Sequence, residues 1–183
     1  MRILIVGPPG AGKGTQAAVL SAELGVAHIS TGELFRENVD GETELGRRVR
    51  KYLEDGALVP DEITNAMVAQ RLTEDDCRDG FLLDGFPRTV GQAQVLEEFL
   101  RDRDCDIDTV LEFDAPEDEV VQRLMARGRG DDTEDVIRHR QQLYHEETAP
   151  LLDFYSDRLI TVPAVGSIAD VTARALDALR TRA

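Results

Sequence analysis

The sequence predicts an α/β fold in which a parallel β-sheet is covered by helices on both faces. Short apolar runs with the length of buried strands alternate with longer segments of helical periodicity, which is the order of a parallel sheet with crossover helices. A glycine-rich turn joins the first apolar run to the first helical segment, and such turns lie at the ligand-binding edge of parallel sheets. The expected strands are residues 2–6, 26–29, 80–83, 109–113 and 159–162.

The helical segments divide into those that cover the sheet and those that extend away from it. Three of them fall between residues 30 and 79, in a stretch that separates two strands, so we expect a helical subdomain that projects from the sheet. An insert of this kind beside the glycine-rich turn indicates a second substrate site. The expected helices lie near residues 13–24, 31–39, 42–55, 61–73, 89–102, 116–127, 133–156 and 167–181.

The composition is that of an ordinary soluble domain and argues against several classes of protein. The 183 residues suffice for one domain with a buried core, and no apolar run approaches the ~20 residues that cross a bilayer. The net charge of −15 argues against a general affinity for nucleic acid or anionic membranes. Cys77 and Cys105 lack the spacing of metal ligands, and the chain begins with a core strand rather than a secretory leader, so we expect a reduced, cytoplasmic protein.

The glycine-rich turn has the composition of a loop that cradles phosphate groups. Residues 7–15 read Gly-Pro-Pro-Gly-Ala-Gly-Lys-Gly-Thr between a strand and a helix. Glycine lets successive backbone N–H groups point at an anion, the helix N-terminus adds a partial positive charge, and Lys13 reaches the outer phosphates. The usual pattern places Ser or Thr directly after the lysine, whereas here Gly14 intervenes and Thr15 follows. A turn that merely joins strand to helix is the alternative, and the spacing favours a nucleotide site.

A second cluster of polar residues follows the strand expected at 80–83. Asp84 stands at the end of this strand, where a carboxylate beside a phosphate loop can hold the hydration shell of a Mg²⁺ ion. Arg88 then offers a bidentate fork for a phosphate. A turn role for Asp84 and a solvated position for Arg88 are the alternatives. The run Asp-Gly-Phe-Pro-Arg directly after an apolar strand disfavours both.

The helix expected at 133–156 places one arginine among apolar residues. At about 100° per residue, Val136, Leu143 and Tyr144 share a face, and Arg140 lies within that stripe. A charge that faces inward is unfavourable unless an opposite charge meets it. Arg140 therefore indicates either a bound phosphate or an internal salt bridge.

These motifs, taken in order, resemble those of the adenylate kinase family along nearly the whole chain. The resemblance implies a three-layer P-loop fold with a five-stranded parallel sheet, a helical insert that binds the nucleoside monophosphate (NMP) and a short lid loop. It also implies the Mg²⁺-dependent, reversible transfer of a phosphoryl group from ATP to AMP, giving two ADP. The matching segments are GPPGAGKGT at 7–15, STGELFR at 30–36, GALVPD at 56–61, LDGFPRTVGQA at 83–93, and Arg140 with TAPLLDFY at 148–155.

The resemblance also implies how the chain is divided. Residues 1–183 form a single domain, with an NMP-binding subdomain at 30–59 and a short lid at 126–132. The remaining segments, the core, are 1–29, 60–125 and 133–183. Many bacterial members of the family carry a longer lid, some with zinc ligands, and this chain has no cysteine cluster there. The expected cofactor is therefore Mg²⁺ with ATP and not zinc, and the expected state is a monomer.

The resemblance assigns roles residue by residue. Gln92 is implied to read the adenine edge of AMP, because a side-chain amide both donates and accepts, as adjacent groups of adenine require. The implied ATP-binding residues are Gly10, Ala11, Gly12, Lys13, Gly14, Thr15, Arg127 and Gly166. The implied AMP-binding residues are Thr31, Arg36, Ala57, Leu58, Val59, Gly85, Phe86, Pro87, Arg88, Gln92, Arg129 and Arg140. The implied catalytic residues are Lys13, Arg88, Arg127, Arg129 and Arg140, and Asp84 is expected to hold Mg²⁺ through water.

Two other functions remain as alternatives. A kinase for another monophosphate, such as UMP or CMP, would use the same fold, but Gln92 and the segment around Thr31 favour adenine. A nucleotide-gated switch or binding module would use the same loop, but the second site argues against it.

Overall fold

The structure, a computed structural model, describes residues 1–128 and 133–182, without side-chain detail at Arg127 and Arg182. Its centre is a five-stranded parallel sheet with the order β2-β3-β1-β4-β5. The strands are β1 (Arg2–Val6), β2 (Ala27–Ser30), β3 (Phe81–Asp84), β4 (Thr109–Asp114) and β5 (Leu159–Pro163). Each lies within one residue of its expected bounds, so the predicted parallel sheet is confirmed.

The central strand β1 shows why these runs form a sheet that is buried on both faces. Residues 3–6 are Ile-Leu-Ile-Val and each is at most 2 % exposed. Their side chains alternate, so that Leu4 and Val6 join one apolar cluster and Ile3 and Ile5 join another on the opposite face. Continuous apolar runs of this kind are typical of parallel strands covered by helices on both sides.

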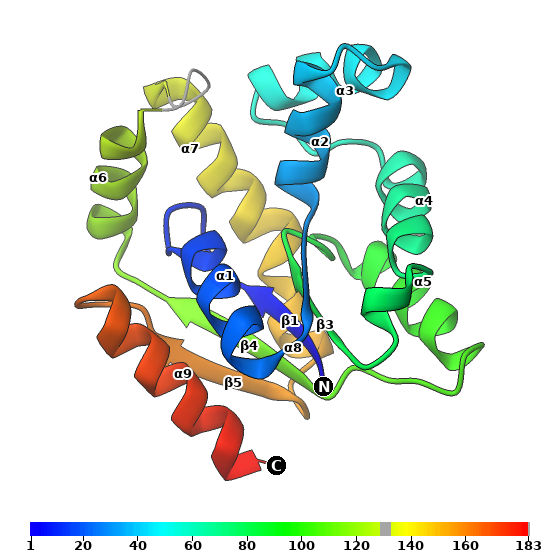
Figure 1. Cartoon of the computed structure of the whole chain (residues 1–183). Helices are drawn as coiled ribbons and strands as arrows, with labels where there is room; N and C mark the ends of the chain where they lie inside the picture. The colour runs from blue at the N-terminus through cyan, green and yellow to red at the C-terminus, as the bar shows by residue number, and fades with distance from the viewer. Residues whose placement is uncertain (129–132, 183) are drawn as a thin grey trace.

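Helices cover each face of the sheet and make the fold three layers deep (Figure 1). One face packs against α1 (Lys13–Leu24), α6 (Glu117–Arg127) and α9 (Ile168–Arg182). The other packs against α4 (Asp61–Arg71), α5 (Val90–Arg101), the turn that follows α7 (Glu134–Leu143), and α8 (Pro150–Phe154). No helix of the described residues is long and apolar enough to span a membrane.

The segment between β2 and α4 projects from this body, as Figure 1 shows at the upper right. It consists of α2 (Thr31–Asp40) and α3 (Glu44–Glu54). The two helices pack on a small apolar core of their own, in which Phe35, Val49 and Val59 are buried. The expected helical insert is therefore present and has a core separate from those of the sheet.

The prediction of one continuous helix at 133–156 is wrong, because the structure divides this segment into two helices and a turn. After α7 the chain makes a π-helical turn over Tyr144–Thr148, where the N–H of Ala149 bonds to the carbonyl of Tyr144 at 2.8 Å, and only then enters α8. The physical reason is Pro150 at the start of α8, which has no N–H to continue the α-helical ladder and whose ring crowds the preceding turn. A one-turn 3₁₀ helix at Asp75–Cys77 was also not expected.

The buried face of α7 differs from the expected stripe. Ile137 and Gln141 are 2 % and 6 % exposed, and Tyr144 continues their row, whereas Val136 and Leu143 are only half-buried. Apolar residues alone misplaced the stripe because a buried glutamine belongs to it. Arg140 lies at the edge of this face and is half-buried.

Candidate active site

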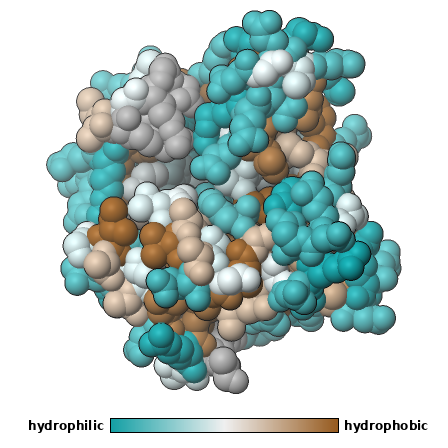
Figure 2. Space-filling view, in the orientation of Figure 1, coloured by the Kyte–Doolittle hydropathy of each residue, from teal (hydrophilic) through white to brown (hydrophobic). Residues whose placement is uncertain are grey.

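A cavity of about 740 Å³ opens above the carboxyl ends of β1 and β3. Its wall is built from the glycine-rich turn, from the α2–α3 segment, from the loop after β3 and from α7. In Figure 2 the surface over α2 and α3 is mostly hydrophilic, and a hollow separates it from the sheet region. Parallel sheets bind ligands at this end of their strands, so the cavity is the candidate active site.

The glycine-rich turn forms the floor of the cavity, and all six of its expected ATP-binding residues, 10–15, line it. Gly10 has φ +90°, and a Cβ there would overlap the carbonyl oxygen of Val120 in α6. The turn thus passes too close to α6 for any side chain at this position. The helix α1 begins within this floor, and a helix N-terminus favours negative charge.

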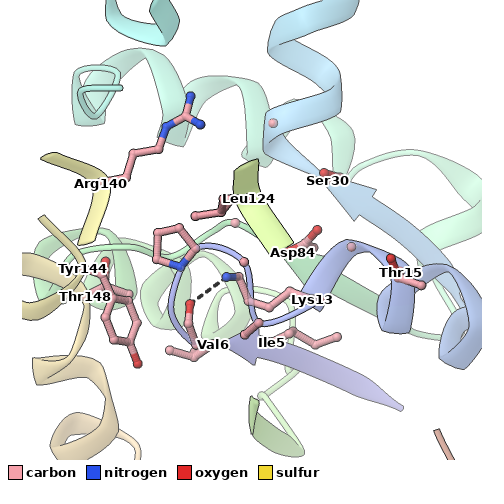
Figure 3. Close-up of a pocket in the computed structure, with 18 of the residues that line it drawn as sticks. Ile5, Val6, Lys13, Thr15, Ser30, Asp84, Leu124, Arg140, Tyr144 and Thr148 are labelled. Carbon is pink, nitrogen blue, oxygen red and sulfur yellow. Dashed lines mark hydrogen bonds between the residues drawn. The ribbon is translucent and has the colours of Figure 1, made fainter. Parts of the chain in front are cut away.

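The Lys13 side chain is folded back over the turn. Its Nζ donates hydrogen bonds to the carbonyl oxygens of Gly7 at 2.7 Å and Pro8 at 2.8 Å. Figure 3 shows this ammonium and the Asp84 carboxylate at the same cavity, with Arg140 reaching it from the side of α7. An ammonium rotates its three donors easily, so Lys13 can exchange loop carbonyls for phosphate oxygens without a backbone change.

Two oxygen-bearing side chains lie beside the turn. Asp84 at the end of β3 is 9 % exposed, and its Oδ2 lies 3.3 Å from the position of a Cβ built on Gly14. Thr15 lines the same cavity one residue further along. A carboxylate and a hydroxyl are the ligands that Mg²⁺ or its bound waters prefer. In the described part of the chain, no group of three or more His, Cys, Asp or Glu residues is placed to hold a metal ion, so a closed protein cage of the zinc type is not seen there.

Three arginines from separate elements face the cavity on the side away from the turn. They are Arg36 of α2, Arg88 after β3 and Arg140 of α7. The Nη2 of Arg140 donates to the carbonyl of Leu53 near the end of α3, at 3.4 Å. Loss of solvent around the guanidinium lowers the pKa of Arg88, and Arg140 and Arg36 lower it further, although Asp84 opposes them. A guanidinium stays protonated in proteins, so this cluster of like charges favours a bound anion.

The peptide of Arg88 is held from both sides. Its N–H donates to Oε1 of Gln92 at 2.7 Å, and its carbonyl accepts from the hydroxyl of Thr148 at 2.9 Å. Its side-chain Nε donates to the carbonyl of Gly85 at 2.9 Å, which also accepts from the Thr31 hydroxyl at 2.9 Å. Gly85 has φ +80°, and a Cβ there would lie 2.8 Å from the Thr31 hydroxyl, so only glycine fits. The loop is thus built to aim one guanidinium.

The loop after β5 completes the cavity at the end of the glycine-rich turn. Gly166 lines it, as expected for an ATP contact, together with Ala164 and Ile168. Nη1 of Arg123 in α6 donates to the carbonyl of Ala164 at 3.0 Å, and Nη2 pairs with Glu119 at 2.8 Å. Arg123 therefore ties α6 to this loop.

The structure brings most of the expected residues to one cavity. On the AMP side the lining residues are Arg36, Ala57, Leu58, Gly85, Pro87, Arg88 and Arg140. Four other expected AMP residues are not among the lining residues and are at most 7 % exposed: Thr31, Val59, Phe86 and Gln92. Arg129 and the side chain of Arg127 fall outside the described residues, so their predicted roles stay predictions.

Sequence reasoning missed several residues that hold this wall in place, one of which, Thr148, itself lines the cavity. Thr148 bonds to Arg88, Nε2 of Gln141 donates to the carbonyl of Pro9 at 3.0 Å, and Asp61 accepts from Gln92 at 2.7 Å. Thr148 and Asp61 fall inside the quoted motifs, but their partners are remote in sequence. No local pattern could have found these contacts.

Comparison with known proteins decides the family. The family model described as adenylate kinase matches residues 5–160. Three proteins named adenylate kinase, from Rhodococcus erythropolis, Nocardia farcinica and Mycolicibacterium vanbaalenii, are 57 %, 56 % and 58 % identical to this chain. Each alignment spans 98 % of this chain and 99 % of the relative. The chain belongs to the adenylate kinase family.

Membership confirms both the expected family and the class of reaction. An adenylate kinase is a transferase that interconverts ATP and AMP with two molecules of ADP, so ATP and AMP are the substrates of this family. The cavity is lined both by the glycine-rich turn and by three arginines from other elements.

Proposed function

We propose that phosphoryl transfer takes place in the cavity, with ATP bound on the glycine-rich turn and AMP bound on the side lined by Arg36, Arg88 and Arg140. The observation that carries this assignment is the convergence of Arg36, Arg88 and Arg140 opposite Lys13 around one cavity of about 740 Å³. The planar fork of N–H donors on a guanidinium matches the oxygens of a phosphate, so three arginines around one cavity suit a phosphate group.

On the ATP side, the backbone N–H groups of residues 10–15 bind the phosphates, and Lys13 reaches the outer ones. The loop at Gly166 contacts the ATP base through its backbone. Arg127 closes on the phosphates from the lid at 126–132. These roles are supported by the cavity lining of residues 10–15 and Gly166 and by the family.

On the AMP side, Arg36, Arg88 and Arg140 bind the α-phosphate and the transferring group, with Arg129 of the lid. Ala57, Leu58 and Val59 contact the base through their backbone, together with Thr31 and the Gly85-Phe86-Pro87 turn. Gln92 reads the adenine edge. Support comes from the cavity position of the three arginines and from the family match.

Asp84 would hold Mg²⁺ through the waters bound to the ion, with the Thr15 hydroxyl beside it. Their oxygen atoms fit the ion, because a hard cation that keeps several waters needs few protein ligands. When bound with ATP, Mg²⁺ supplies charge neutralisation on the phosphates.

The mechanism needs no protein nucleophile. The AMP phosphate oxygen attacks the γ-phosphorus in line with the leaving ADP, and Lys13, Arg88 and Arg140 offset the charge on the transferring group together with Arg127 and Arg129. The subdomain at 30–59 and the lid at 126–132 close over the substrates and exclude water, because an open site would hydrolyse ATP.

We further propose a cytoplasmic monomer that binds neither nucleic acid nor membrane, with no zinc, and with the domain bounds given above. The net charge of −15 supports the absence of nucleic-acid and anionic-membrane binding. Gel filtration with light scattering tests the monomer, and metal analysis of the purified protein tests the absence of zinc.

The test of the function is ADP formation from MgATP with AMP, GMP, CMP or UMP as the acceptor, with and without EDTA. We expect a strong preference for AMP and loss of activity when Mg²⁺ is removed. If another monophosphate is used better than AMP, the proposed mechanism stands but the assignment of AMP as the acceptor is wrong. If ADP forms without an acceptor, or does not form at all, the proposed kinase activity is wrong. If activity survives EDTA, the proposed role of Mg²⁺ is wrong.

A further inference from the structure

The amide of Gln92 is held in one orientation by two neighbours. Its Oε1 accepts from the backbone N–H of Arg88 at 2.7 Å, and its Nε2 donates to Oδ1 of Asp61 at 2.7 Å. Gln92 is 2 % exposed, so its amide has little access to water, whereas the partner Asp61 is exposed. A carboxylate only accepts and a backbone N–H only donates. Neither partner therefore tolerates an amide turned by 180°, and the network identifies which amide atom is oxygen.

Asp61 is well placed to hold this orientation. It is the first residue of α4 and lies three residues after the segment 56–58, which lines the cavity. Its Oδ2 accepts from the Thr89 hydroxyl at 3.3 Å, and that hydroxyl in turn accepts from the backbone N–H of Gln92 at 3.1 Å. The carboxylate thus contacts the side chain of Gln92 and also the residue that caps α5.

We propose that Asp61 is a positioning residue that sets the selectivity for the acceptor base by fixing the Gln92 amide. The inference rests on the proposed AMP site, in which Gln92 meets the base. A side-chain amide has a second N–H and a second oxygen lone pair beyond the two contacts above. Adenine presents an amino donor at C6 and an acceptor at N1. The fixed amide matches both when Oε1 faces the amino group and Nε2 faces N1.

A 6-oxo purine presents the opposite pattern, an acceptor at C6 and a donor at N1. It is matched only by an amide that has been turned. Turning would set Oε1 of Gln92 against the Asp61 carboxylate and Nε2 against the Arg88 N–H, two repulsive contacts in a buried place. The site therefore rejects inosine monophosphate (IMP) through hydrogen-bond mismatch, since IMP and AMP have nearly the same shape.

The competing explanation is that Asp61 only stabilises the N-terminus of α4, where negative charge is favourable. Glu62 shares that first turn and is also exposed, and no contact of the described residues joins it to Gln92. The substitutions Asp61→Asn and Glu62→Gln therefore form a matched pair, because each removes one negative charge and keeps the shape. Asparagine presents either an oxygen or an amino group to Gln92, so it follows the amide when the amide turns.

The experiment measures kcat and KM for ADP formation from MgATP with AMP and with IMP, in the wild type and both variants. For Asp61→Asn we expect the ratio of kcat/KM for AMP to that for IMP to fall about tenfold, mainly through a lower KM for IMP. The Glu62→Gln variant should keep the wild-type ratio. Asp61→Ser, whose hydroxyl also donates and accepts, repeats the test if the asparagine variant does not fold, as judged by thermal unfolding.

Three results would overturn the inference while leaving the kinase intact: an unchanged ratio in Asp61→Asn, an equal fall in both variants, or equal use of AMP and IMP by the wild type. The absence of ADP with either acceptor in the wild type would instead overturn the proposed function. The two failures are thus distinguishable in one set of assays.

Discussion

The glycine-rich turn takes its cavity residues 10–15 from one continuous segment, whereas the arginine side takes Arg36, Arg88 and Arg140 from three separate elements. On the turn, the groups offered to a ligand are mainly backbone N–H groups, whose direction follows from φ and ψ. On the arginine side they are guanidiniums at the ends of long side chains, whose direction depends on contacts remote in sequence. The first wall is therefore sensitive to backbone changes and the second to the loss of single side chains.

The largest effect on activity should follow from Arg88→Ala. The variant removes a charge that acts on the transferring phosphate, and we expect kcat to fall by about 10²–10³ with an unchanged unfolding temperature. The matched control is Arg138→Ala, because Arg138 is an exposed arginine of α7 whose ion pair with Glu134, at 2.6 Å, lies on the surface. Steady-state kinetics measures both, and wild-type turnover in Arg88→Ala would refute the assignment of this wall.

The second-largest effect, on stability and on the KM for MgATP, should follow from Gly10→Ala in the glycine-rich turn. Gly10 has φ +90° and no room for a Cβ beside Val120, so we expect the free energy of unfolding to fall by about 3 kcal/mol and the KM for MgATP to rise. Gly25→Ala is the control, because Gly25 ends α1 with φ +65° but has nothing within 4 Å of an added Cβ. It should lose only about 1 kcal/mol. Urea unfolding compares the two, and equal losses would show that crowding at Gly10 is unimportant.

A smaller effect should come from Thr148→Val, which removes the hydroxyl that holds the Arg88 carbonyl. We expect kcat to fall about three- to tenfold, because the loss of one hydrogen bond is worth about 1 kcal/mol and Arg88 is then aimed less well. Thr148→Ser keeps the hydroxyl and should restore most of the activity. If serine is as slow as valine, the methyl group of Thr148 and not its hydroxyl supports the site.

The smallest effect should come from Gln141→Met, which tests the link between the two walls. Gln141 follows Arg140 in α7 and donates to the carbonyl of Pro9 in the turn. Its loss should reduce the free energy of unfolding by about 1 kcal/mol and raise the KM for both nucleotides less than about threefold. The exposed neighbour Gln142, which bonds only to Glu146 on its own helix face among the described contacts, is the control, and Gln142→Met should change neither quantity. A change in the KM for one nucleotide alone would contradict the link.

Much of this molecule follows from local sequence. The strand β1, the turn and α1 were predicted with their bounds, because an apolar run, a glycine-rich turn and a helix are each determined over a few residues. Asp84 and Arg88 were expected at the ligand-binding edge of the sheet because they directly follow a buried strand, and both line the cavity there.

The errors have physical causes as well. The helix expected at 133–156 is interrupted because the loss of one N–H at Pro150 changes the hydrogen-bond pattern of the preceding turn. The buried stripe of α7 was misplaced because Gln141 is buried by its bond to Pro9, a contact that hydrophobic periodicity does not register.

By itself, the sequence determined the fold class, the family and the glycine-rich turn, since these depend on local patterns and motif order. It also predicted that Arg36, Arg88 and Arg140 reach the site, and these three line the cavity. Only the tertiary structure decided that Gln92 is bound to Asp61, 31 residues away, and that Thr148 holds Arg88 across 60 residues. Hydrogen bonds act over about 3 Å and carry no periodicity along the chain. Their partners are therefore set by how the helices pack on the sheet, and the direction of the Arg88 guanidinium is a property of the folded chain.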